Sequence, residues 1–365
     1  MAVSNAEPHA HEHRALPRAL ILLLGLAAAV VVIAGMKSIA SILGPTVLAL
    51  MLVIAAHPLR NWLERRGFAP WATVTITLLL IYAILIGLVS ALVVSVARFA
   101  AILPEYQGKF DELLGKARQL LGQYGVGEDQ VQKALNVDAN RVFSVVGPAL
   151  GSTFGVLSAL LLVATLALFM AADASNYTRR LAILERSRPQ LVEALRTFSR
   201  GTREYLVVST VFGLIVAVLD TAALWIIGIP LPILWGLLAF ITNYIPNIGF
   251  VLGVVPPALL GLLEGGPLTM LVVIVVYSVI NFVVQTVIQP KIVGDTAGLS
   301  VTLAMASLIF WGWVLGALGA LLAIPLTLLA KAVLVDTDPS ARWVKVLLSS
   351  KVDDETERDA ELVAK

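Results

Sequence analysis

Long apolar stretches separated by short polar segments dominate the chain. A transmembrane helix needs about 20 mainly apolar residues. The stretches that qualify cover residues 17–35, 39–57, 71–97, 148–172, 205–228, 231–263, 267–288 and 299–331. The first is followed at once by the second, without a small-residue cleavage site, so we interpret it as a retained span rather than a secretory signal. The pattern predicts an all-α polytopic membrane protein with six to eight transmembrane segments.

Two of these stretches, 231–263 and 299–331, are interrupted near their middle by proline or glycine. Each half has about 14 residues, which is too short to cross about 30 Å of hydrocarbon at about 1.5 Å per residue. Two half-helices that meet at such a break form a re-entrant hairpin, which a membrane tolerates only where the backbone lines a cavity or is buried in protein. Long, kinked, ordinary spans are the alternative. The break residues are Pro246, Gly249 and Pro256 in the first stretch, Gly312 and Gly316 in the second, and Pro290 between them.

The order of segments in the C-terminal half indicates an internal repeat. Span 205–228 precedes the first broken stretch, and span 267–288 precedes the second. If both hairpins are re-entrant, they enter from opposite sides, which is the layout of an inverted repeat. Such repeats commonly place the substrate site near the membrane midplane.

Composition agrees with a membrane protein and excludes several classes of partner. The chain is 59% hydrophobic and only 14% charged, with a mean hydropathy of +0.91, whereas a soluble domain needs about a quarter of its residues charged. The net charge of +2 indicates no nucleic-acid partner. Cysteine is absent, which excludes disulfides and thiolate ligands. The sequence contains no phosphate-binding loop, catalytic triad, zinc motif or dinucleotide fingerprint, so we predict no cofactor, no metal site and no enzymatic activity.

Arginine placement predicts the orientation, because Lys and Arg stay preferentially in the cytoplasm. The arginine-rich segment 173–204 and both termini should therefore face the cytoplasm of a cell whose inner membrane holds the chain. The predicted organisation is a cytoplasmic leader (1–16), N-terminal spans (17–97), an outer helical insert (98–147), a span (148–172), an arginine-rich amphipathic helix at the cytoplasmic interface (173–204), a C-terminal transport core (205–331) and a cytoplasmic tail (332–365).

Asp220 is the sharpest candidate for a functional residue. It lies well inside the apolar span 205–228. Ionisable groups inside a bilayer are expensive, and an ionised carboxylate there needs a partner, a bound cation or a proton. The alternative is a structural aspartate that bonds to a neighbouring helix.

Amide side chains form a second candidate feature. Asn281, Gln285 and Gln289 recur every four residues, which puts them in one row on one helix face. Such a row suits binding of a hydroxylated solute or a small cation, although amides also join helices. Asn243 and Asn247 flank the first break, where helix ends expose unpaired backbone groups able to hold an ion or a polar solute. Capping of the broken helix by these asparagines is the alternative.

Three motifs together resemble the autoinducer-2 exporter family. They are IPNIG at 245–249, QPKIVG at 289–294 and GALGALLAIP at 316–325. The order of parts along nearly the whole chain is similar too. The resemblance implies export of a small, polar, polyhydroxylated furanone signal in quorum sensing, and it suggests a homo-oligomer. Some members of this broad family look like monovalent cation/proton antiporters instead.

The sequence therefore leaves three hypotheses open. The first is a secondary transporter that exports a small polar solute of the autoinducer-2 type. The second is a monovalent cation/proton antiporter, which an intramembrane aspartate fits better. The third is a membrane scaffold without transport, in which the amides serve packing. In each case the lipid bilayer is the surrounding partner.

Overall fold

A computed structural model describes residues 17–102, 104–106, 108–109, 112, 115–116, 119, 153–246, 248–293 and 299–337. The leader 1–16, most of the outer insert, Asn247 and the tail from residue 338 lie outside the described residues, so the predictions made for them stay predictions.

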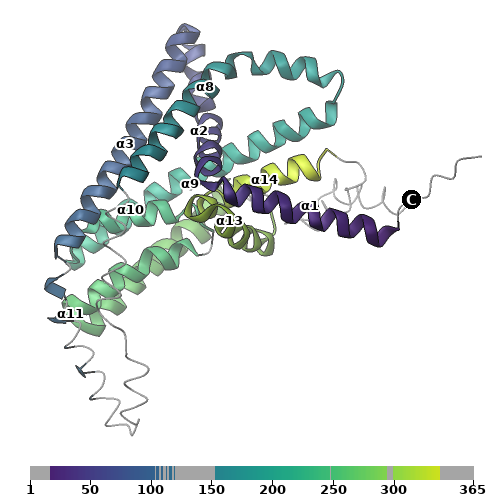
Figure 1. Cartoon of the computed structure of the whole chain (residues 1–365). Coiled ribbons are helices and arrows are strands. Elements are labelled where there is room, and N and C mark those ends of the chain that lie inside the picture. The colour runs from purple at the N-terminus through teal and green to yellow at the C-terminus, as the bar shows by residue number, and fades with distance from the viewer. Residues whose placement is uncertain are drawn as a thin grey trace, which may run out of the picture.

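Every regular element in these ranges is a helix, as Figure 1 shows. The helices are α1 (Arg18–Ser38), α2 (Ala40–Arg65), α3 (Pro70–Ile102), α8 (Thr153–Glu185), α9 (Pro189–Ile227), α10 (Pro232–Thr242), α11 (Gly249–Asn281), the π-helix η1 (Phe282–Ile288), α12 (Gln289–Val293), α13 (Val301–Leu321) and α14 (Ala323–Leu334). Five helical stretches are long and apolar enough to cross a membrane: Ala40–Arg65, Pro70–Phe99, Pro189–Ile227, Gly249–Ile292 and Val301–Leu321. Shorter apolar helices accompany them. The predicted all-α polytopic fold is confirmed.

Helix α9 is the central element of the fold (Figure 1). Its first half packs against α14, in a core that joins Ala194 and Phe198 to Leu326. Its second half packs against α10, where Leu224 shares a core with Trp235. A third core joins α2, α3 and α8. The two broken stretches therefore lie against opposite halves of one long helix.

The arginine-rich segment 173–204 differs from its prediction as a single amphipathic helix. The structure shows the end of α8 and the start of α9, separated by a turn at residues 186–188. Pro189 explains the difference, because proline disfavours helical geometry in the residue before it and suits the first position of a new helix. Arg196 donates from Nη1 and Nη2 to the two carboxylate oxygens of Glu185, at 2.7 and 2.9 Å, and so joins the two helix ends.

The first broken stretch folds back on itself between Thr242 and Gly249. Gly249 lies against Thr242 and Gly253 lies against Ala239, so the chain runs antiparallel on the two sides of the turn. The turn requires glycine, because a Cβ at residue 249 would lie 2.0 Å from the Thr242 carbonyl oxygen. Helix α10 has 11 residues, about 16 Å at the α-helical rise, and cannot cross a bilayer alone. The predicted break is confirmed; entry into a membrane from one side stays a prediction.

The second broken stretch reverses at Gly316. This residue has a φ of 68° and a ψ of −147°, a conformation that glycine adopts readily. The two arms then touch, since Trp311 Nε1 donates to Thr327 Oγ1 at 3.0 Å. The prediction that Gly312 is part of the break is wrong, because Gly312 lies inside α13, before the reversal.

Two predicted proline breaks turn out differently from each other. The prediction of a break at Pro256 is wrong, because this residue lies inside α11. Membrane helices tolerate proline where neighbouring groups satisfy the freed carbonyl. Pro290 does perturb the helix: the π-helix η1 lies directly before it. A proline cannot donate to the carbonyl four residues earlier and its ring clashes there, and the wider π turn relieves that clash.

Side chains at the start of the outer insert contact α11. Tyr106 donates a hydrogen bond to one carboxylate oxygen of Glu264, and Lys109 Nζ lies 3.0 Å from the other. Helical geometry is interrupted next to this contact, at Gly266, where α11 changes direction. The predicted boundary between residues 263 and 267 falls at the same place.

Candidate functional site

Asp220 is fully buried on α9, with an exposed fraction of 0%. Both oxygens of its carboxylate are buried, and neither has a hydrogen-bond partner among the described residues. Buried polar groups are normally paired, and each exception calls for an explanation such as an unseen water, an ion or a functional role. Asp220 is such an exception.

Tyr277 on α11 is the second exception. Its side chain is 1% exposed, and its hydroxyl has no partner in the described part of the chain. Buried tyrosine hydroxyls usually find a partner. Tyr277 was not among the predicted site residues. Its place four residues before Asn281, on the same helix face, was the available signal.

Three amides form a continuous chain of hydrogen bonds beside these two groups. Gln285 Nε2 donates to Asn243 Oδ1 at 2.6 Å and to Asn281 Oδ1 at 2.9 Å. Asn243 Nδ2 donates to the Ser209 carbonyl oxygen at 3.0 Å. Asn281 Nδ2 donates to the Tyr277 carbonyl oxygen at 2.9 Å. The amides therefore link α9, the C-terminal end of α10, α11 and η1.

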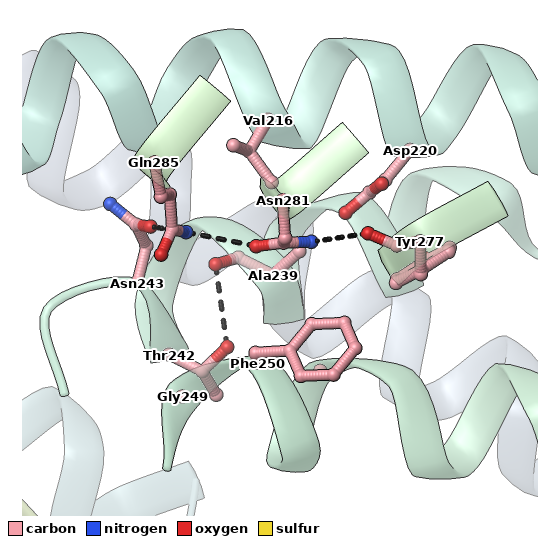
Figure 2. A pocket seen from close by; sticks show the side chains of 11 residues that line it. Val216, Asp220, Ala239, Thr242, Asn243, Gly249, Phe250, Tyr277, Asn281 and Gln285 are labelled. Atoms are coloured by element: carbon pink, nitrogen blue, oxygen red, sulfur yellow. Dashed lines mark hydrogen bonds between the residues drawn. The ribbon is translucent and has the colours of Figure 1, made fainter. Parts of the chain in front are cut away.

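All these side chains line one small cavity between α9, α10 and α11 (Figure 2). The cavity has room for about one water molecule. Its walls are Val216, Asp220, Ala239, Thr242, Asn243, Gly249, Phe250, Gly253, Tyr277, Asn281 and Gln285. Thr242 bonds back to its own helix, through the Leu238 carbonyl at 2.9 Å. Among these lining residues, the buried groups without a partner in the described part of the chain are the Asp220 carboxylate and the Tyr277 hydroxyl.

The structure gathers four of the six predicted site residues. Asp220, Asn243, Asn281 and Gln285 meet at the cavity, while Gln289 does not line it. Gln289 does not continue the row at the cavity, because the π-helix η1, which contains Gln285 and ends just before Gln289, changes the angular spacing. Asn247 lies outside the described residues.

Within the described ranges, no group of three or more His, Cys, Asp or Glu side chains could hold a metal ion. The side chains around the cavity include one carboxylate, three amides and two hydroxyls. Oxygen-rich sets of this kind suit a proton, a water molecule or a small hard cation, or the hydroxyls of a polar solute.

Comparison with known proteins decides the family. Residues 21–337 match the family model described as AI-2E family transporter. The chain belongs to the AI-2E transporter family. AI-2 transport protein TqsA of Escherichia coli (strain K12) is 29% identical over 330 residues, which cover 90% of this chain and 95% of TqsA. "Putative transport protein YhhT" of the same strain is also 29% identical over 330 residues, covering 90% of this chain and 93% of YhhT. A transport-protein relative from Haemophilus influenzae is 29% identical over 333 residues, covering 89% and 95%.

Membership in the AI-2E family agrees with the helical architecture. A multi-pass membrane protein with a role in membrane transport accounts for both. The relatives are named as transport proteins rather than as enzymes. The resemblance seen in the three sequence motifs is thereby confirmed at the level of the family.

Proposed function

We propose that this AI-2E family member is a secondary transporter that exports a small polar solute and uses Asp220 to carry the coupling proton or cation. The observation that carries the proposal is the buried, unpartnered Asp220 carboxylate at the cavity between broken helices. The name of the relative TqsA supports a solute of the autoinducer-2 type.

Coupling by an ion follows from the energetics of Asp220. An ionised carboxylate without a partner is very costly to bury. A proton on the carboxyl group, or a cation beside it, removes that charge. The occupant of Asp220 is therefore expected to change only when the cavity opens to water, which is the requirement for coupling to a gradient.

Solute binding requires the amide chain to open. The cavity holds about one water molecule, so a furanone does not fit in this conformation. Amide–amide hydrogen bonds exchange for bonds to solute hydroxyls at little net cost. The hydrogen bonds of Gln285 to Asn243 and Asn281 join separate helices, so their exchange suits alternating access around a midplane site.

Exchange of a monovalent cation for a proton, without any solute, is a second candidate. The size of the cavity favours it, because a single small ion fits without rearrangement. The third hypothesis, a scaffold without transport, gains no support from Asp220, since a residue kept only for packing gains nothing from an unpaired carboxylate.

The membrane arrangement completes the proposal. Both termini are proposed to face the cytoplasm of the inner membrane, supported by the arginines of 173–204. An inverted repeat is proposed from the order of the segments, in which a span precedes each folded-back stretch. A homo-oligomer is proposed from the family resemblance.

Flux in proteoliposomes tests the proposal. Liposomes holding the purified protein are loaded with the furanone autoinducer, and efflux is measured with and without pH and sodium gradients. Wild-type protein should release the solute faster than protein-free liposomes do, at a rate that depends on a gradient. Asp220→Asn should remove that dependence. Asp173→Asn is the matched control, because the Asp173 side chain, within α8, is 75% exposed. Equal efflux from wild type, Asp220→Asn and empty liposomes would refute the proposal.

A further inference from the structure

The Asp220 site contains a second buried group without a partner among the described residues, the Tyr277 hydroxyl. We propose that Tyr277 is the second ligand of the coupling-ion site, and that its hydroxyl oxygen allows the site to hold a monovalent cation in place of the Asp220 proton. This inference rests on the proposed function, because it assigns the occupants of the same carboxylate.

The geometry brings the two groups to one cavity from different helices. Asp220 lies on α9 and Tyr277 on α11, and both line the same space (Figure 2). Their exposed fractions are 0% and 1%, and neither has a hydrogen-bond partner among the described residues.

The rest of the cavity wall contributes no charge. The lining residues from α10, the turn and α11 are neutral, and the amides are bonded to one another or to backbone carbonyls. A single positive charge at Asp220 therefore makes the closed cavity electrically neutral, as its burial requires. Either a proton or one monovalent cation can supply that charge.

The exchange of these occupants balances. With the cavity open to water, the O–H bond of the Asp220 carboxyl group breaks and the proton leaves on a water molecule. One monovalent cation enters and lies between the carboxylate and the Tyr277 oxygen. One positive charge leaves and one arrives, so the closed state stays neutral in both cases.

Tyr277 matters for the cation and much less for the proton. A proton is held by a covalent bond to one carboxylate oxygen and needs no further ligand. A hard cation is held by several oxygen ligands together. Replacing tyrosine by phenylalanine removes one such oxygen while keeping the ring, so it should weaken cation binding and leave protonation of Asp220 in place.

Labelling with dicyclohexylcarbodiimide tests this assignment without knowledge of the solute. The reagent modifies protonated carboxyl groups in apolar surroundings, and mass spectrometry of the full-length protein's peptides locates the product. Purified protein in liposomes is labelled at one fixed pH with increasing LiCl, NaCl or KCl, and choline chloride keeps the ionic strength constant. Tyr82→Phe is the control, because the Tyr82 hydroxyl bonds to the Ala164 carbonyl, away from the cavity.

We expect at least one of the three cations to protect Asp220 in the wild type and in Tyr82→Phe. Tyr277→Phe should still be labelled at Asp220, but protection should need about ten times more salt, the effect of losing one bond to a charged group. Equal protection of Tyr277→Phe and wild type would overturn the role of Tyr277. Labelling that no cation prevents would overturn the cation site. A wild type that is not labelled at Asp220 would contradict the proposed function itself.

Discussion

Replacing Asp220 by leucine should stabilise the protein and abolish transport. The carboxylate is fully buried without a partner, and burying such a polar group costs about 1–3 kcal/mol as measured in proteins. Leucine removes that cost, and the neighbouring cavity takes up part of its larger volume. We therefore expect the free energy of unfolding to rise by about 1–3 kcal/mol.

Thermal unfolding in detergent, followed by the fluorescence of the 7 tryptophans, measures this change. The expected rise in melting temperature is about 2–6 °C. Asp220→Asn is the control, because the amide has the same shape and stays polar, so it should give little or no gain. In buffer without monovalent metal cations, a melting temperature of Asp220→Leu that is several degrees below wild type would show that the carboxylate has a stabilising partner within the protein, and the reasoning would fail.

Three further predictions follow from the contacts described above. Gly249→Ala should lower the melting temperature by several degrees, because the new Cβ meets a carbonyl oxygen at 2.0 Å, whereas Gly25→Ala, with nothing within 4 Å, should not. Gln285→Leu should leave two amide oxygens without their donor, which should lower the unfolding free energy measured by denaturant titration by about 1–3 kcal/mol. Cysteines placed in the cavity should also become easier to label with maleimides. Unchanged stability and unchanged labelling would contradict this prediction. Arg196 lowers the pKa of Glu185 through its hydrogen bonds, so their contribution to stability is present above the ordinary glutamate range and lost as pH falls through the lowered pKa. In the wild type, hydrogen exchange near the α8–α9 turn should therefore become faster as the pH falls through this lowered pKa. The same pH dependence of exchange in the wild type and in Glu185→Gln would argue against a stabilising Glu185–Arg196 pair.

The sequence was sufficient for the fold class and for the position of Asp220. A carboxylate inside an apolar span is rare because of its solvation cost, so its presence alone made Asp220 a candidate. The break around Pro246 and Gly249 was also predictable, because half-helices of this length cannot cross a bilayer.

Other features depend on contacts that one sequence does not contain. Gly312 and Gly316 are both glycines, so the sequence does not show which of them interrupts the helix. Packing decides that Gly316 takes the positive φ. Gln289 would continue the amide row only in a regular α-helix, and the π-helix that precedes Pro290 is not regular. Tyr277 lies on the same helix face as the amide row, but it was not predicted as a site residue because a buried aromatic residue is ordinarily part of a core. Its unpaired hydroxyl is visible only once the facing helices are in place.

The pH inside proteoliposomes, followed with an entrapped pH-sensitive dye, tests most directly whether Asp220 carries the coupling ion. An outward proton gradient is imposed, and the solute or a monovalent cation is then added on one side. Wild-type protein should dissipate the gradient when the co-substrate is present, and Asp220→Asn, reconstituted to the same density, should leave it intact. Dissipation by Asp220→Asn at the wild-type rate would contradict the central role assigned to this carboxylate.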